Sequence, residues 1–197
     1  MTPAVVTPKA QRTALVAVDV QRDFLPGGAL GVPHGNAVVA PLLRLAELCP
    51  VVVATRDFHP RDHVSFNDRG GPWPPHCIAG TPGALIHPAV DAVAQAVISK
   101  GLEREREAYS GFDGTWLEHL LRSLGIRDVI IGGLATDYCV RATAVAAVAA
   151  GFATTVAVDA VRAVDVQAGD GDRALAAMRE AGVSLAETGA LVATAAS

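Results

Sequence analysis

Cysteine, aromatic residues and charge are all scarce in this chain of 197 residues. The three cysteines, Cys49, Cys77 and Cys139, stand at unrelated spacings, which argues against a disulfide framework and for reduced thiols. The net charge of −4 gives no support for a nucleic acid or an anionic membrane as partner. No apolar run reaches the ~18 residues of a membrane span, and the first dozen residues lack the apolar region of a signal peptide. We therefore expect a cytoplasmic protein that acts on a small molecule.

The chain instead has abundant apolar residues, arranged in short runs that alternate with helical segments. Apolar residues make up 51 % of the chain, as expected for a globular protein. Several valine- and isoleucine-rich runs are apolar nearly throughout, which is typical of parallel strands covered on both faces. The predicted strands are Ala14–Val20, Val51–Thr55, Val97–Lys100, Val129–Gly133, Thr154–Val158 and Val183–Ala186. The predicted helices are a segment from Asn36 as cap to Cys49, Thr115–Leu124, Tyr138–Ala150, Asp172–Ala181 and a short Gly189–Ser197.

This alternation predicts an α/β fold, in which a three-layer α/β/α sandwich surrounds a mostly parallel sheet of six strands. We expect one domain over residues 13–197, preceded by a flexible extension at residues 1–12. The exception to the alternation is residues 57–88, which are dense in proline, glycine, histidine and tryptophan. A loop of that length in a compact domain is usually functional, and a bound metal would help to order it.

Three of the six histidines fall between residues 57 and 76 of this long segment, beside an aspartate. Neutral imidazoles and a carboxylate are ligands of a divalent transition metal, and the candidates are Asp57, His59, His63 and His76. A polar surface loop is the alternative interpretation. His87 is an alternative to His76 as the fourth ligand, although the sequence Leu-Ile-His87-Pro is typical of the start of a helix. Cys77 is also a candidate soft ligand, but a packing role is favoured for it and for Cys49.

Reactive side chains also stand where four predicted strands end. The first strand ends at Asp19, the second runs into the metal segment, the third ends at Lys100 and the fourth leads to Cys139. Because parallel sheets place ligands outside the carboxyl ends of their strands, these groups should share one crevice. Cys139 would lie in the first turn of a helix, where free backbone N–H groups favour a thiolate and can hold an oxyanion. Separately, each residue also has a purely structural interpretation: a buried thiol, a strand-end carboxylate or a solvated lysine.

Motifs along the chain resemble those of the nicotinamidase/pyrazinamidase family, within the isochorismatase-like cysteine hydrolases. The matching strings are Val-Asp19-Val-Gln-Arg-Asp-Phe24, Thr-Arg-Asp57-Phe-His59-Pro, Asp62-His63-Val-Ser-Phe, Trp73-Pro-Pro-His76-Cys, Ser-Lys100-Gly, Tyr109-Ser-Gly-Phe112 and Gly133-Leu-Ala135-Thr-Asp137-Tyr-Cys139. The resemblance covers about Thr13 to Glu187, and the metal segment is its most specific part.

The resemblance implies the roles of individual residues. Asp19, Lys100 and Cys139 would form a catalytic triad, and the amides of Ala135 and Cys139 an oxyanion hole beside a cis peptide between Leu134 and Ala135. Asp57, His59, His63 and His76 would hold one divalent metal, usually zinc, with manganese or iron as alternatives. Phe24 and Trp73, and more weakly Tyr109, would pack on the substrate ring.

The implied reaction is hydrolysis of nicotinamide to nicotinate and ammonia through a thioester, in NAD salvage. Pyrazinamide would be a second substrate, and a homo-oligomer remains open. Two other functions also stay open. One is a related hydrolase that acts on isochorismate or on an N-carbamoyl amide. Hydrolases of that class have a similar triad but lack the Asp/His metal segment. The other is a non-catalytic metal- or ligand-binding homologue, which would have no need of a nucleophile.

Overall fold

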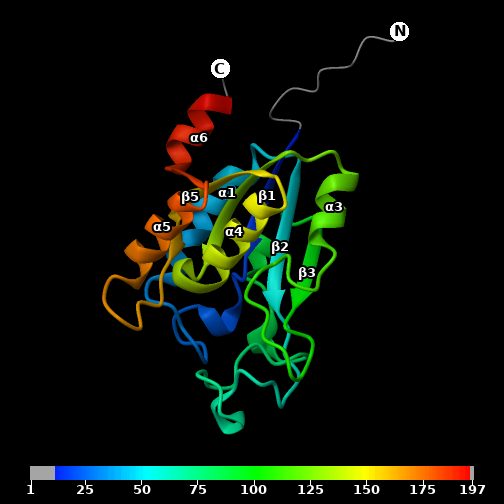
Figure 1. Cartoon of the computed structure of the whole chain (residues 1–197), viewed down its shortest axis with the longest axis vertical. Coiled ribbons are helices and arrows are strands. Elements are labelled where there is room, and N and C mark those ends of the chain that lie inside the picture. The colour runs from blue at the N-terminus through cyan, green and yellow to red at the C-terminus, as the bar shows by residue number, and fades with distance from the viewer. Residues whose placement is uncertain (1–11, 196–197) are drawn as a thin grey trace.

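The computed structural model describes residues 12–195, and the side chains of residues 12–193. Its centre is a sheet of six strands in the order β3-β2-β1-β4-β5-β6, and every ladder between neighbours is parallel (Figure 1). The strands are β1 (Thr13–Val18), β2 (Val51–Asp57), β3 (Ala96–Lys100), β4 (Asp128–Leu134), β5 (Ala153–Arg162) and β6 (Ser184–Ala186). The predicted α/β fold with six strands is thus confirmed.

Helices cover both faces of the sheet, because successive residues of a strand point to opposite sides. On one face Leu15 and Ala17 of β1 share a core with the layer formed by α1 (Val39–Ala46), α2 (Pro88–Asp91) and α6 (Thr188–Ala195). On the other face Ala14 and Val16 share a second core with α3 (Leu117–Ser123), α4 (Arg141–Ala149) and α5 (Asp170–Glu180). The result is the predicted three-layer sandwich.

The predicted elements are all present, with shifted ends. The predicted strand Thr154–Val158 is too short, since β5 continues to Arg162 past an irregularity in its pairing with β4. The predicted helix cap at Asn36 is wrong, because a 3₁₀ turn occupies Gly35–Val38 and α1 begins only after Val38. The glycines expected to end three helices, Gly125, Gly151 and Gly182, all have positive φ angles.

The long segment between β2 and α2 is held by its own backbone hydrogen bonds. The His59 N–H donates to the Cys77 carbonyl at 3.0 Å, and the Asn67 N–H donates to the Trp73 carbonyl at 2.7 Å. Phe66 is fully buried at its centre. Part of the order that we attributed to a bound metal therefore comes from the segment itself.

The sheet has one topological switch point, between β1 and β4. From β1 the chain proceeds outward to β2 and β3, and from β4 it proceeds outward the other way to β5 and β6. Connections that leave two neighbouring strands in opposite directions open a crevice at their carboxyl ends. Any site of this fold is therefore expected beside Asp19 and the turn that follows Leu134.

The proposed extension at residues 1–12 lies outside the described residues except for Arg12, as do residues 196 and 197 of the proposed domain. The division at residue 13 stays a prediction. In the part of the chain that the structure describes, no helix combines the length and apolar character that crossing a bilayer requires.

The close approach of β1 and β4 gives a first prediction. Gly133 has a φ of +123°, and a Cβ added there would lie 2.0 Å from the Val18 carbonyl oxygen. Gly133→Ala should therefore lower the free energy of unfolding by at least ~3 kcal/mol, because backbone strain and a backbone clash add. Gly125→Ala is the matched control, since Gly125 also has positive φ but has nothing within 4 Å of an added Cβ. It should cost only about 1 kcal/mol. Equal urea midpoints for the two variants would contradict this account.

Candidate active site

Four strand ends deliver charged or nucleophilic side chains to the crevice. Asp19 follows β1, Asp57 ends β2, Lys100 ends β3, and Cys139 lies in a π-helical turn, Thr136–Val140, between β4 and α4. All four side chains are buried. The prediction that these groups share one crevice is confirmed. The sequence predicts Cys139 within a continuous α-helix, whereas the structure places it in the wider turn before α4.

The Lys100 ammonium joins these groups. Its Nζ lies 2.9 Å from Asp19 Oδ2 and 2.5 Å from Asp57 Oδ1. It also donates to Cys139 Sγ at 3.4 Å and to the Ala108 carbonyl at 3.2 Å. Because a buried ammonium is stable only when it is paired, Lys100 and the two carboxylates depend on one another.

The two oxygens of Asp19 have different surroundings. Oδ1 accepts a hydrogen bond of 2.6 Å from the Thr55 hydroxyl. Within residues 12–195, no group donates to Oδ2 with hydrogen-bond geometry, although the Lys100 ammonium lies 2.9 Å away as an ion pair. The Asp19 carboxylate also interacts with the Cys139 thiol, so it is placed to exchange a proton with the sulfur. Sequence reasoning missed Thr55, although its position at the end of the neighbouring strand was a usable signal.

Burial and charge set the protonation states of this group. Burial alone would lower the pKa of Lys100, but Asp19 and Asp57 raise it well above its usual range. Burial alone would raise the pKa of Asp57, but Lys100 and His59 hold it below its usual range. Lys100 is thus a fixed cation and Asp57 a fixed anion.

Cys139, the predicted nucleophile, rests as a thiol. Burial raises the pKa of Cys139 well above its usual range, although the Lys100 ammonium opposes the shift. Desolvation thus outweighs the nearby cation, and the thiol must lose its proton to a base before it can attack. Burial also raises the pKa of Asp19, which makes it a stronger base than an ordinary aspartate. Cys49 and Cys77 are buried among apolar side chains, as the packing interpretation predicts.

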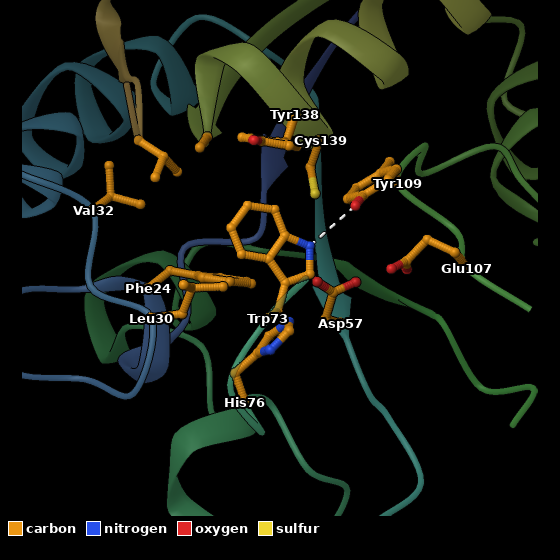
Figure 2. Close-up of a pocket in the computed structure, with 12 residues that line it drawn as sticks. Phe24, Leu30, Val32, Asp57, Trp73, His76, Glu107, Tyr109, Tyr138 and Cys139 are labelled. Atoms are coloured by element: carbon orange, nitrogen blue, oxygen red, sulfur yellow. Dashed lines mark hydrogen bonds between the residues drawn. The ribbon is translucent and has the colours of Figure 1, made fainter. Parts of the chain in front are cut away.

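A pocket opens beside the Cys139 sulfur (Figure 2). The part of it that a water-sized sphere can enter is small, about 30 Å³. The lining is mostly apolar or aromatic and comprises Phe24, Leu30, Val32, Trp73, Tyr109, Ala135, Tyr138 and Val164, with Asp57, His76, Glu107 and Cys139 as the polar members. The indole N–H of Trp73 donates to the Tyr109 hydroxyl at 3.1 Å.

The three ring-packing residues predicted from the sequence, Phe24, Trp73 and Tyr109, all line this pocket. Ala135 and Cys139, the predicted oxyanion-hole residues, line it too, and the peptide between Leu134 and Ala135 is cis as expected. Sequence reasoning missed Leu30, Val32, Glu107, Tyr138 and Val164. Two of them carried a signal, since Tyr138 directly precedes the predicted nucleophile and Leu30 ends the motif Gly27-Gly28-Ala-Leu, which also resembles the family.

Asp137 connects the nucleophile turn to one wall of the pocket. Its two carboxylate oxygens accept the backbone N–H groups of Val164 and Asp165 at 3.0 and 2.9 Å. The segment after β5 is thereby held against the turn that carries Cys139.

Three predicted metal ligands lie together, and two of them, Asp57 and His76, line the pocket. The ligand atoms of Asp57, His59 and His76 all lie within 4.8 Å of one another. The Nδ1 atoms of His59 and His76 lie 3.0 and 2.8 Å from the carbonyls of Gly101 and Pro74. Carbonyls accept from N–H, so each Nε2 keeps its lone pair for a metal. The residues present therefore fit a divalent ion with nitrogen and oxygen ligands.

His63, the fourth predicted ligand, is turned differently. Its ring stacks on His59 with centroids 4.1 Å apart, but its Nε2 lies 2.9 Å from the Arg106 carbonyl. It groups with His59 and Glu107 rather than with Asp57. Its role as a ligand stays a prediction. The competitor His87 instead accepts the Ala89 N–H at the start of α2.

Comparison with known proteins identifies the family of this chain. The family model described as Isochorismatase domain matches residues 13–190. Over 184 residues the chain is 46 % identical to the nicotinamidase/pyrazinamidase of Mycobacterium tuberculosis, and the match covers 87 % of this chain and 97 % of that protein.

Two solved structures are similar over most of their length. One is a pyrazinamidase of Pyrococcus horikoshii in complex with zinc, with a TM-score of 0.83 and 44 % identity, covering 89 % of this chain and 99 % of that one. The other is PnC1 of L. infantum in complex with nicotinate, with a TM-score of 0.87 and 37 % identity, covering 94 % and 97 %. The chain belongs to the isochorismatase family of hydrolases. Within that family, its similar relatives include proteins named nicotinamidase or pyrazinamidase.

The ligand group gives a second prediction. Elemental analysis of the purified protein should find about one divalent metal per chain. His59→Ala and His76→Ala should each reduce this below about one-tenth, because each removes one of three clustered ligands. His87→Ala is the control and should keep its metal.

His63→Ala decides the fourth position. If His63→Ala loses as much metal as His59→Ala, His63 is a ligand. If it retains its metal, the protein supplies three ligands. Full metal content in both His59→Ala and His76→Ala would contradict the ligand group itself.

Proposed function

We propose that this chain is a nicotinamidase that hydrolyses nicotinamide, and pyrazinamide, to the corresponding acid and ammonia. The observation that carries the proposal is the Lys100 ammonium, which joins a buried carboxylate and a buried thiol beside an aromatic pocket. The names of similar relatives support the same substrate class, and the metal-ligand group supports it over the isochorismate and N-carbamoyl alternatives.

The first half of the reaction forms a thioester. Asp19 Oδ2 takes the proton of Cys139 as Sγ attacks the carboxamide carbon. The negative charge thus passes from the Asp19 carboxylate to the sulfur and then to the substrate oxygen, and it stays near the Lys100 ammonium. The amides of Ala135 and Cys139 stabilise the oxyanion of the tetrahedral intermediate. Asp19 then gives its proton to the leaving nitrogen, and ammonia departs.

The second half regenerates the thiol. A water molecule attacks the thioester carbon while Asp19 accepts its proton, and Cys139 leaves as the acid forms. The proton on Asp19 returns to the sulfur. Lys100 stays protonated throughout and lowers the cost of each negative charge that appears beside it.

The metal centre has a separate role in this proposal. Asp57, His59 and His76 would hold the ion, with His63 added by the family resemblance, and zinc is the expected metal, with manganese or iron as alternatives. When bound, the metal would orient the substrate ring through its pyridine nitrogen. Phe24, Trp73 and Tyr109 confine the ring. A cytoplasmic location, a part in NAD salvage and a homo-oligomeric state remain predictions of the sequence.

The triad gives a third prediction. Cys139→Ala should abolish ammonia release from nicotinamide while leaving the melting temperature and metal content unchanged, because only the nucleophile is lost. Asp19→Asn should lower kcat by at least ~10²-fold, since it removes the base and the later acid. Cys49→Ala is the control and should stay active. Substantial turnover by Cys139→Ala would rule out the thioester.

A fourth prediction separates ring orientation from chemistry. Benzamide has the same carboxamide but lacks a ring nitrogen, so the metal-loaded protein should turn it over at least ~10²-fold more slowly than nicotinamide. A chelator should abolish nicotinamide hydrolysis and yet leave Cys139 open to alkylation by iodoacetamide. Equal turnover of the two amides would contradict the orienting role, even if the ligand group were right.

A further inference from the structure

Glu107 is a carboxylate at the pocket that neither the triad nor the predicted ligand set uses. It lines the pocket together with Asp57 and His76, and Figure 2 shows its side chain directed toward Asp57. It is half-buried, whereas residues 102–106 before it are exposed. Glu107 is therefore the first residue of this segment, after the exposed residues 102–106, that contacts the pocket.

The charge of Glu107 has no cation in the structure. Its Oε1 accepts the backbone N–H of Ala108 at 2.9 Å. The two nearest glutamates are paired, Glu103 with an arginine at 3.4 Å and Glu105 with another at 3.0 Å. Among residues 12–195, no lysine, arginine or histidine forms an ion pair with Glu107. The Glu107 carboxylate is therefore available to a cation that binds beside it.

The position of Glu107 indicates where that cation would lie. Its carboxylate and the ligand atoms of His59 and His63 lie within 4.8 Å of one another. His59 also belongs to the group with Asp57 and His76, so the two ligand groups overlap at one imidazole. Glu107 therefore adjoins the predicted metal position from the side of His63.

The charges of the buried groups support this assignment. Asp19 and Asp57 share the Lys100 ammonium, which leaves one net negative charge. A divalent ion alone would turn this into one net positive charge in a desolvated site. Glu107 makes the loaded site neutral.

We propose that Glu107 is a positioning residue of the metal centre, whose negative charge stabilises the bound divalent ion. This inference rests on the metal role in the proposed function. It does not require that nicotinamide be the substrate.

Zinc titration of the full chain tests it. The dissociation constant for zinc is measured by competition with a chromogenic chelator in the unaltered protein, in Glu107→Gln and in Glu103→Gln. Glutamine keeps the shape of Glu107 and an oxygen for the Ala108 N–H, so only the charge is lost. Glu107→Gln should weaken zinc binding by about 10- to 100-fold. Glu103→Gln makes the same change at an exposed position of the same segment and should stay within about twofold.

A second measurement separates charge from backbone placement, because Ala108 also accepts from Lys100. The rate of Cys139 alkylation in the metal-free protein should be the same in Glu107→Gln and the unaltered chain. Weaker zinc binding with an unchanged alkylation rate supports the proposal. Unchanged zinc binding overturns it, and so does weaker binding with an altered alkylation rate, which would assign the effect to Ala108 and Lys100.

The outcome is also distinct from that of the nicotinamide assay. An unaltered chain that binds zinc without hydrolysing nicotinamide would refute the reaction and leave the role of Glu107 to be decided by the titration. An unaltered chain that binds no zinc would refute the metal centre and this inference together.

Discussion

The buried ammonium of Lys100 is the constraint on which the rest of the site depends. An isolated charge inside a protein is very costly, so Lys100 requires the two carboxylates that neighbouring strands bring to it. Asp57 lies opposite Lys100 in the parallel ladder between β2 and β3, and Asp19 follows the next strand along the sheet. The same contacts that satisfy the lysine align the proposed base Asp19, the proposed nucleophile Cys139 and the predicted metal ligand Asp57. Stability and chemistry therefore depend on the same few atoms.

The topology of the sheet explains why these residues meet. The strand ends that bear Asp19, Asp57 and Lys100 are neighbours on one side of the switch point, and the nucleophile turn lies on the other. The long segment after β2 then supplies the imidazoles, and the segment before Tyr109 supplies Glu107. The pocket is thus bordered by parts of the chain that are distant in sequence and are brought together by the parallel pairing of neighbouring strands.

Much of this arrangement was predictable from the sequence, for a specific physical reason. Valine- and isoleucine-rich runs identify buried parallel strands, and a reactive residue at the end of each run is placed by the rule that carboxyl ends share one edge. What the sequence did not reveal depends on three-dimensional contacts. Thr55 and Val164 are ordinary residues until folding places them against Asp19 and the pocket. The direction of the His63 ring depends on the Arg106 carbonyl, and the resting thiol of Cys139 depends on a degree of burial that motif spacing does not encode.

The central place of β1 in the sheet has a consequence for the newly made chain. This strand leaves the ribosome before β4, and one of its two hydrogen-bonding edges is covered only when β4 has been synthesised. At ordinary rates of translation the interval between β2 and β4 lasts on the order of 10 s. During that time an apolar strand with an open edge is exposed to pairing with other chains. Successful folding in the cell therefore depends on how that edge is protected before the second half of the protein exists.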